Sequence, residues 1–578
     1  MIKRLARCVR QYKRAALVTP LMIAGEAVIE CLIPFVIALL IERIRDGCAY
    51  TEIVQYGVTL FVLACLSLCF GGAAGYTSAK ASSGFAKNLR HDMFARVQQY
   101  SFENIDKFSP ASLVTRMTTD VFFVQMSFMQ IIRIAVRCPL MFLFSVIMAY
   151  VMGGVLASLF VVVIPLMLFG LIMISRKAMP AFRRVFKKYD RLNEAIEENV
   201  RAARTVKGFS REGYETEKFL TASDDIRRDF TKAERIVALN APLMQGCLYL
   251  NMVAILLFGS YLIVSRSGAD LDVGQLSAMI TYGFQILMSL NMLTMVYVML
   301  TMSAESARRV IEVLDEQPAL QNPEDALCSI PDGSITFENV CFKYAAAAEK
   351  NTLSDICLTI QAGQTVGILG GTGSSKSTLV QLIPRLYDVT EGRVLVGGND
   401  VRRYDLQTLR NGVAMVLQNN QLFSGTIREN LCWGNPDATD EQIEQACRVA
   451  CAHDFVTSFP QGYDTYIEQG GTNVSGGQKQ RLCIARALLK QPHILIFDDS
   501  TSAVDTKTDA HIRTQLRQTL PQTTKLIIAQ RVLSVMDADM IVVLDGGRIA
   551  ATGTHEQLLQ SCPIYAEIYQ QQTGGQQA

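Results

Sequence analysis

The chain has 578 residues, a formal net charge of +2 and 15 cysteines. It is too long for one domain, and the near-zero net charge excludes the strongly basic surface typical of nucleic-acid-binding proteins. The cysteines form no CxxC pair and no Cys/His cluster, so we expect free thiols in a reducing compartment rather than disulfides or a metal centre.

Apolar helical runs dominate the first half of the chain, after a basic segment at residues 1–14. Each of six runs is long enough to cross ~30 Å of hydrocarbon at ~1.5 Å per residue. The connectors at 79–127 and 176–239 are long and rich in Lys and Arg, which predicts that they lie in the cytoplasm together with both termini. The expected spans lie near residues 16–42, 53–78, 128–151, 153–175, 240–264 and 274–302.

Both long connectors keep a helical period, so we expect them to continue the membrane helices into the cytoplasm. Each has one interruption, at 108–112 in the first connector and at 208–213 in the second. We expect these interruptions to be hairpin tips that can touch a soluble domain.

Two glutamates, Glu26 and Glu30, lie four residues apart on one face of the first span. A carboxylate at membrane depth costs about 2–3 kcal/mol, so the presence of two requires a functional or structural explanation. One interpretation is a contact with a polar or cationic substrate. The other is a buried pair satisfied by Arg133, Arg137 or water.

A methionine stripe runs along the sixth span with spacings of 4, 3, 4 and 3 residues, which keeps its members on one helical face. Methionine surfaces adapt to varied apolar ligands, but the same stripe could also pack against neighbouring helices. The five residues are Met288, Met292, Met295, Met299 and Met302.

Prolines and a Pro-Asp-Gly turn mark residues 303–334 as a linker. From there the pattern changes to short β-type runs, so we expect a soluble α/β domain over 335–570. The Gln- and Gly-rich tail at 571–578 is expected to be disordered.

A glycine-rich turn follows the apolar run 365–369 and precedes a helical run, which is the context of a phosphate-binding loop. Its glycines let backbone amides face an anion, and the following helix N-terminus adds a positive dipole end. Lys376 would reach the β- and γ-phosphates, and Ser377 would hold Mg²⁺. Ser375 departs from the pattern, which has glycine there. The loop comprises Gly370, Gly371, Thr372, Gly373, Ser374, Ser375, Lys376, Ser377 and Thr378.

Three further residues are candidates for the same site. Tyr344, ahead of the loop, could stack on a base, and Gln418 could join the Mg²⁺ shell or sense the γ-phosphate. Asp498 ends a hydrophobic strand, as suits an aspartate that orients Mg²⁺. A second anion-binding turn opens a helix and implies a site completed by another subunit; it comprises Val474, Ser475, Gly476, Gly477 and Gln478.

With these motifs the chain resembles an ABC transporter of the exporter type over nearly its whole length. The resemblance implies a polytopic α-helical membrane domain, with six transmembrane helices and long cytoplasmic extensions, fused to an α/β P-loop ATPase domain. It implies that 370–378 is the Walker A loop, 494–498 the Walker B strand and 474–478 the signature, while Gln418 belongs to the Q-loop. It also implies a D-loop at 502–505 and coupling helices around 109–115 and 205–213. ATP and Mg²⁺ would be the cofactors, in a dimer with two ATP molecules at its interface.

Two departures from the family pattern fall at one site. The family has glutamate after the Walker B aspartate, and this chain has the shorter Asp499. The family has histidine after the strand 525–529, and this chain has Gln530, which cannot carry a positive charge.

The altered Walker site beside a nearly intact signature resembles the degenerate-site subunit of a heterodimeric bacterial exporter of the multidrug type. The expected partner is a second ABC half-transporter, in a bacterial plasma membrane and among its lipids, and the expected cargo is an amphipathic, hydrophobic or lipid-like small molecule. No nucleic-acid partner is expected. Two alternatives stay open: a homodimeric exporter in which Asp499 hydrolyses ATP slowly, and a regulatory or gating membrane protein that binds ATP without pumping a substrate.

Overall fold

The computed structural model describes residues 2–265, 271–345, 348–499 and 504–573. The chain divides into two compact units. The first comprises Met1–Gln98 and Pro110–Glu316, and the second comprises Gln99–Ser109 and Gln317–Ala578. The segment Gln99–Ser109 therefore leaves the first unit in sequence and folds with the second, which no periodicity in the sequence indicates.

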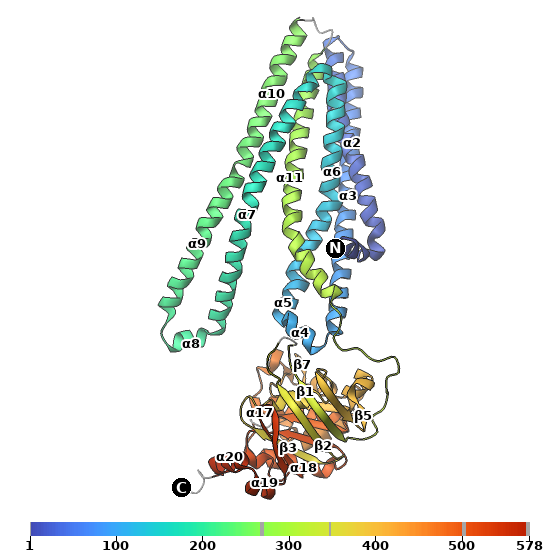
Figure 1. Cartoon of the computed structure of the whole chain (residues 1–578). Coiled ribbons are helices and arrows are strands. Elements are labelled where there is room, and N and C mark those ends of the chain that lie inside the picture. Colours follow the sequence, from blue (N-terminus) through green and yellow to red (C-terminus); the bar gives the residue numbers. More distant parts are fainter. Residues whose placement is uncertain (1, 266–270, 346–347, 500–503, 574–578) are drawn as a thin grey trace. The chain divides into compact units, whose positions relative to one another are not determined.

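The first unit consists of long helices (Figure 1). Its longest members run for 26 to 49 residues, because apolar stretches without internal turn signals favour uninterrupted helix. The helices are α1 (Ile2–Arg7), α2 (Lys13–Arg45), α3 (Tyr50–Gln98), α5 (Pro110–Thr115), α6 (Val121–Gly153), α7 (Leu159–Arg201), α8 (Ala203–Gly208), α9 (Glu212–Ala238), α10 (Asn240–Ser265) and α11 (Val273–Asp315).

Among the residues that the structure describes, five helical segments are long and apolar enough to cross a membrane. One of them, Pro110–Phe182, contains both α6 and the first part of α7. These two helices are separated by a 3-10 turn at Gly154–Ser158, where Gly154 adopts a positive φ of 50°. The other segments are Arg10–Arg45, Tyr50–Gln98, Glu212–Ser265 and Val273–Asp315.

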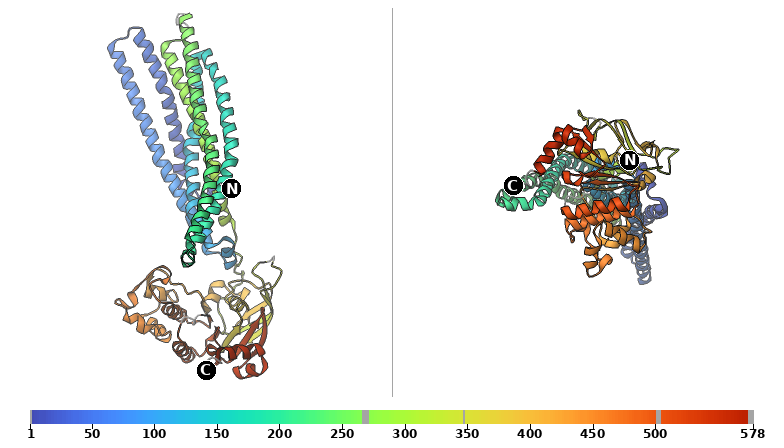
Figure 2. Two further views of the ribbon diagram at one scale, coloured as in Figure 1. Left: turned by 90° about the vertical axis from the view of Figure 1, so that its left-hand side faces the viewer. Right: turned by 90° about the horizontal axis from the view of Figure 1, so that it is seen from below.

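The helices of the first unit pack in neighbouring pairs, among them α2 with α3 and α6 with α11. Figures 1 and 2 show α2 and α3 side by side at the blue end of the chain. Close approach depends on small residues, as is common between membrane helices. A Cβ atom on Gly274 of α11 would lie 2.3 Å from the carbonyl oxygen of Ala38 in α2.

Helices α7 and α9 pair in their polar halves, beyond the apolar part of α7. Lys188 Nζ lies 2.8 Å from Asp229 Oδ2 and 3.7 Å from Asp225 Oδ2 across this pair. Both connectors were predicted to extend the membrane helices, and α7 and α9 are such extensions. The short helix α8 lies between them, and the break that follows it at 209–211 falls within the predicted second interruption.

The core of the second unit is a six-stranded sheet in the order β12-β11-β3-β10-β9-β6. All neighbours are parallel except β11 and β12. The strands are β3 (Thr365–Gly370), β6 (Val413–Val416), β9 (Ile494–Asp498), β10 (Thr524–Ile528), β11 (Met540–Asp545) and β12 (Arg548–Gly553).

Both faces of this sheet are covered, which explains why its strands read as continuous apolar runs. In β9, Leu495 and Phe497 pack into one hydrophobic core, while Ile494 and Ile496 pack into the other. The first core contains residues from α14 (Ile427–Cys432), α15 (Asp440–Val449), α16 (His453–Ser458), α17 (Gly476–Leu489), α18 (Thr506–Thr519), α19 (His555–Ser561) and α20 (Pro563–Thr573).

The second core lies between the six-stranded sheet and a smaller antiparallel sheet in the order β2-β1-β4-β5. Its strands are β1 (Ile335–Phe342), β2 (Leu353–Ile360), β4 (Glu391–Val396) and β5 (Asn399–Asp400), and the helices α12 (Lys376–Gln381) and α13 (Leu406–Gly412) complete this core. The C-terminal helix α20 continues to Thr573, so residues 571–573, predicted to be disordered, are helical.

Candidate functional site

Four neighbouring parallel strands bring the predicted nucleotide-site residues to one edge of the sheet. The loop 370–378 begins at the carboxyl end of β3, Gln418 follows β6, and Gln530 follows β10. Asp498 and Asp499 stand at the carboxyl end of β9. Ligands of open parallel sheets bind outside these carboxyl ends, so the topology itself predicts a binding site here.

The loop 370–378 is held in a conformation that needs small residues. A Cβ atom on Gly370 would lie 2.2 Å from the carbonyl oxygen of Leu544. Ser375, which stands where the family pattern has glycine, adopts a left-handed conformation with φ 69° and ψ 27°. The left-handed backbone conformation costs an L-residue about 1–2 kcal/mol, so this serine is a strained substitute for glycine.

Lys376 and Ser377, in the last part of the loop 370–378, open helix α12. Lys376 Nζ donates to the carbonyl oxygens of Gly370 and Gly371 at 3.0 and 2.8 Å, which folds the ammonium group back over the loop. Ser377 Oγ donates to Asp498 Oδ1 at 2.8 Å. A hydroxyl paired with a carboxylate supplies hard oxygen ligands, so these residues fit Mg²⁺.

Asp499 is held by two carboxamides. Gln530 Nε2 donates to Asp499 Oδ2 at 2.7 Å, and Gln418 Nε2 donates to the same oxygen at 3.3 Å. The backbone N–H of Asp499 also bonds the carbonyl oxygen of Ile528 at 3.1 Å. Asp499 has a positive φ of 47°, a region that Asp tolerates better than most residues. In this structure Gln418 therefore engages Asp499, and among the described residues it forms no hydrogen bond with the Ser377–Asp498 pair.

Burial sets the electrostatics of this cluster. It raises the pKa of Asp498, and nearby Asp499 adds to that increase, against the Ser377 hydrogen bond and Lys376. Burial also raises the pKa of Asp499, against the hydrogen bonds from Gln418 and Gln530. For Lys376, burial lowers the pKa, and the two aspartates oppose that change. The cluster thus contains charges that lack full solvation and favour a counter-charged ligand such as Mg²⁺.

Tyr344 lies over the start of α12. Its hydroxyl is 2.9 Å from Thr378 Oγ1 and donates to Gln381 Oε1 at 3.3 Å. Its ring meets the ring of Tyr387 edge-on, with centroids 5.2 Å apart. The side chain is 46% exposed, so an aromatic face next to the phosphate loop is open to solvent.

Tyr387 connects the ring of Tyr344 to helix α4 (Phe102–Phe108). No pattern in the sequence predicts this contact. Its hydroxyl donates to Asp106 Oδ2 at 2.8 Å, and its ring lies 6.0 Å from that of Phe102. Burial and the Asp106 carboxylate raise the pKa of Tyr387 above its usual value. A docking contact with the soluble domain was expected around 109–115; the segment that folds with the second unit is Gln99–Ser109, and Pro110–Thr115 belongs to the first.

The second anion-binding turn begins α17 as expected. Ser475 is the N-cap: its Oγ accepts from the Gln478 N–H at 3.3 Å, and its own N–H donates to Gln478 Oε1 at 2.9 Å. Among the described residues, no hydrogen bond links 474–478 to the loop 370–378. Of the predicted D-loop, Ser502 and Ala503 lie outside the described residues, and Asp505 caps α18 by accepting from the Thr508 N–H at 2.9 Å.

Two further cavities occur in the second unit. One, of about 330 Å³, lies beside Gln421 and contains the stacked rings of Phe423 and Trp433, with centroids 4.1 Å apart. Burial lowers the pKa of Arg486 in its wall. Its lining comes from segments far apart in sequence, which explains why no local motif predicted it.

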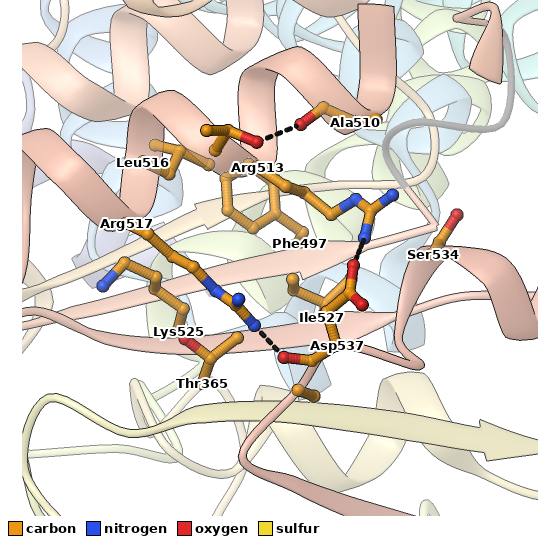
Figure 3. A pocket seen from close by; sticks show the side chains of 12 residues that line it. Thr365, Phe497, Ala510, Arg513, Leu516, Arg517, Lys525, Ile527, Ser534 and Asp537 are labelled. Atoms are coloured by element: carbon orange, nitrogen blue, oxygen red, sulfur yellow. Dashed lines mark hydrogen bonds and ion pairs between the residues drawn. The ribbon is translucent and has the colours of Figure 1, made fainter. Parts of the chain in front are cut away.

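The other cavity has about 90 Å³ and contains three cationic side chains (Figure 3). Arg513 Nη1 lies 3.5 Å from Asp537 Oδ2, and Arg517 donates to the Asp537 carbonyl oxygen. Lys525 Nζ donates to two carbonyl oxygens at 2.6 and 2.9 Å. Because each cation already has a protein partner, this cluster is part of the structural core.

In the membrane unit, Arg137 of α6 neutralises the Glu30 carboxylate. Its Nη2 atom donates to both Glu30 oxygens at 2.6 and 2.7 Å and lies 3.6 Å from Glu26 Oε1. Arg133 is exposed and forms no ion pair among the described residues. The structure thus favours a satisfied pair at Glu30, while Glu26 shares the same cation at longer distance.

The methionine stripe lies on the less buried face of α11. Met292, Met295 and Met302 are exposed, and Met288 and Met299 are half-buried. The opposite face of the same helix is buried, with Tyr282 and Ile286 fully enclosed. Within this chain, the stripe is therefore not the surface that packs against α6.

The comparisons with known proteins agree with these features. Residues 17–290 match the family model of the ABC transporter transmembrane region, and residues 353–502 match the ABC transporter model. The chain is 36% identical over 574 residues to an ABC transporter ATP-binding protein of Mycobacterium tuberculosis, covering 97% of this chain and 96% of that protein. The chain belongs to the ABC transporter family. This ABC transporter is also 33% identical over 568 residues to YfiB of Bacillus subtilis, with 98% and 97% of the two chains covered.

A solved structure described as a bacterial Atm1-family ABC exporter with ATP bound superposes with a TM-score of 0.82. It covers 98% of each chain at 24% identity, and at that identity the likeness concerns the fold. This ABC transporter therefore has an exporter-type fold, with a helical membrane domain joined to a nucleotide-binding domain. It is an ATPase coupled to transport across a membrane, and proteins of this architecture work as dimers.

Proposed function

We propose that the chain is one half of a heterodimeric exporter that drives an amphipathic or hydrophobic substrate across the plasma membrane. ATP binding closes two nucleotide domains on each other, and hydrolysis, mainly at the partner's site, resets them. The chain's own Walker residues build a degenerate site that retains ATP. Its signature completes the active site on the partner.

The single observation that carries this proposal is the bonding of Asp499. A general base must reach the attacking water, and this acid is one methylene shorter than the family's glutamate. Its Oδ2 atom is occupied by Gln530 at 2.7 Å and by Gln418 at 3.3 Å. Gln530, which replaces the family's histidine, thus directs one of its two N–H donors to Asp499 and carries no charge for the γ-phosphate.

The other motif residues support nucleotide binding at this site. The amides of 370–378 would wrap the phosphates and Tyr344 would stack on the base. Ser377 and Asp498, already 2.8 Å apart, would hold Mg²⁺, with Gln418 at its edge. Bound Mg²⁺ would supply positive charge to the phosphates and keep both buried aspartates ionised.

The signature 474–478 is proposed to act on the partner's ATP. Ser475 caps α17, and Ser475 and Gly476 are exposed, so the positive dipole end of this 14-residue helix is open to another molecule. The absence of bonds to the chain's own phosphate loop, among the described residues, fits a surface that serves another subunit.

We infer six crossings, with both termini in the cytoplasm. The segment Pro110–Phe182 is 73 residues long, which is more than three times what one crossing needs. It divides at Gly154–Ser158 into α6 and α7, so it supplies two crossings. With the other four segments this makes six.

For the substrate we propose the face of α11 that carries Met292, Met295 and Met302, together with the Glu26–Arg137–Glu30 cluster. Replacing these three methionines with Ala should lower transport of an apolar dye, whereas Met173→Ala on α7, 45% exposed against 46% for Met292, should not. Glu26→Gln should reduce transport of a cationic dye and leave a neutral dye unaffected. Unchanged transport in either variant would remove the corresponding residues from the substrate site.

The heterodimer is tested by coexpressing two differently tagged copies of this chain in its native host, which supplies the partner, and purifying through one tag. We expect a complex of about twice the chain mass that lacks the second tag. A stable complex with both tags would contradict the heterodimer and favour a homodimeric transporter.

A further inference from the structure

The backbone around Gln530 is held by a side chain from the end of the chain. Gln572 Nε2 donates to the Gln530 carbonyl oxygen at 2.8 Å, and Gln572 Oε1 accepts from the Val532 N–H at 2.7 Å. Both distances are typical of good hydrogen bonds, and one carboxamide thus bridges two backbone groups on either side of Arg531.

Helix α20 is anchored well enough to hold this bridge in place. Tyr565 is fully buried, and its hydroxyl lies 2.6 Å from His555 Nδ1 of α19. The ring of Tyr569 meets the His555 ring with centroids 5.1 Å apart. Tyr565, Tyr569 and Gln572 are spaced four and three residues apart, so they share one helical face.

The bridge lies in direct continuity with the acid of the nucleotide site. Gln572 bonds the backbone of Gln530, and the Gln530 side chain bonds Asp499 Oδ2 at 2.7 Å. The position of the Gln530 backbone therefore determines whether its carboxamide reaches Asp499. If it does not, Asp499 presents a less compensated negative charge to the γ-phosphate of a bound nucleotide.

We propose that Gln572 is a positioning residue that keeps Gln530 on Asp499 and so slows the release of nucleotide from this chain's own site. This inference rests on the proposed function, since it concerns retention of ATP at the Walker site. The simpler interpretation is that Gln572 only satisfies the Val532 N–H, the first donor of a short 3-10 helix at Val532–Ser534. Water would serve equally well in that case, and nucleotide release would not change.

The test measures release of a fluorescent, non-hydrolysable ATP analogue with Mg²⁺ from the full-length chain in detergent. Gln572→Ala should release it about threefold to tenfold faster with an unchanged association rate, as expected for one hydrogen bond. Gln571→Ala is the matched control, because within the described part of the chain the Gln571 side chain bonds Glu567 of its own helix, at 3.2 Å, and no other residue. It should release the analogue at the wild-type rate.

A second pair of variants separates positioning from general stability. In a Gln530→Ala background, Gln572→Ala should have no further effect on release, because no carboxamide is left to position. Gln572→Glu keeps an acceptor for the Val532 N–H and loses the donor to Gln530. It should keep slow hydrogen exchange at Val532 yet release nucleotide faster.

Wild-type release rates in both Gln572→Ala and Gln572→Glu, or fully additive effects in the Gln530→Ala background, would overturn the inference. The parent chain's ATP hydrolysis is measured alongside. Brisk hydrolysis would contradict the proposed degenerate site, whereas the effect of Gln572 on release of the non-hydrolysable analogue would still be decided.

Discussion

Restoring the family's two residues should restore hydrolysis at this chain's own site. The change is Asp499→Glu together with Gln530→His. The added methylene extends the carboxylate by ~1.5 Å, and a misplacement of ~1 Å can cost on the order of 100-fold, or ~2.7 kcal/mol.

One cost reduces that gain. Residue 499 has a φ of 47°, a backbone conformation in which glutamate is less favourable than aspartate by about 1 kcal/mol. The net gain is therefore ~1.7 kcal/mol, which corresponds to a rate increase of about 20-fold. The histidine also frees the Asp499 position from the 2.7 Å bond with Gln530.

The assay is phosphate release by the complex that this chain forms with its partner, purified through a tag on this chain, with ATP binding measured separately. The control is Asp499→Asn with Gln530→His, which keeps the size of the side chain at 499 and removes the base. If the restored variant binds ATP as the wild type does but releases phosphate no faster than this control, the shortened acid is not what limits hydrolysis.

Three further outcomes are expected. Burial raises the folded-state pKa of Asp498 and Asp499, so the folded chain binds more protons than the unfolded chain at pH values between the ordinary and the raised pKa. The unfolding temperature without nucleotide should therefore fall as pH rises through that window, and it should fall less in Asp499→Asn. An equal dependence of unfolding temperature on pH in the two proteins would contradict the raised pKa of Asp499. Arg137→Met should leave the Glu26 and Glu30 carboxylates without a counter-charge and destabilise the first unit by ~3–5 kcal/mol, which would lower its unfolding temperature. Adding Glu26→Gln and Glu30→Gln should restore that temperature. An unchanged unfolding temperature in Arg137→Met would mean that water alone solvates the two carboxylates. Tyr387→Phe should remove the bond to Asp106 and speed hydrogen exchange across 102–108, whereas unchanged exchange would show that this hydroxyl does not hold α4.

The nucleotide site could be predicted from sequence because its residues stand at the ends of recognisable strands. The apolar runs of β3, β6, β9 and β10 each stop at a motif residue, and parallel pairing brings those ends together without further information. The same local logic predicted the capped start of α17 at Ser475. The shared helical face of the methionine stripe likewise follows from periodicity alone.

The remaining features depend on contacts between residues far apart in sequence. Nothing local predicts that Gln99–Ser109 folds with the second unit, or that Asp106 meets Tyr387. The left-handed backbone at Ser375 and the two carboxamides on Asp499 are also tertiary outcomes. The tail was predicted to be disordered from its composition, but α20 continues to Thr573. Its Gln572 side chain bonds the backbone of Gln530 and Val532, and composition alone does not indicate such contacts.

The central claim is most directly tested by measuring Mg-ATP hydrolysis by this chain purified alone, with the mass of the complex determined in parallel and Asp499→Asn as control. We predict ATP binding with negligible turnover, equal in the chain and in the control. Brisk turnover by a homodimer, lost in Asp499→Asn, would mean that Asp499 is a competent base and would contradict the degenerate site.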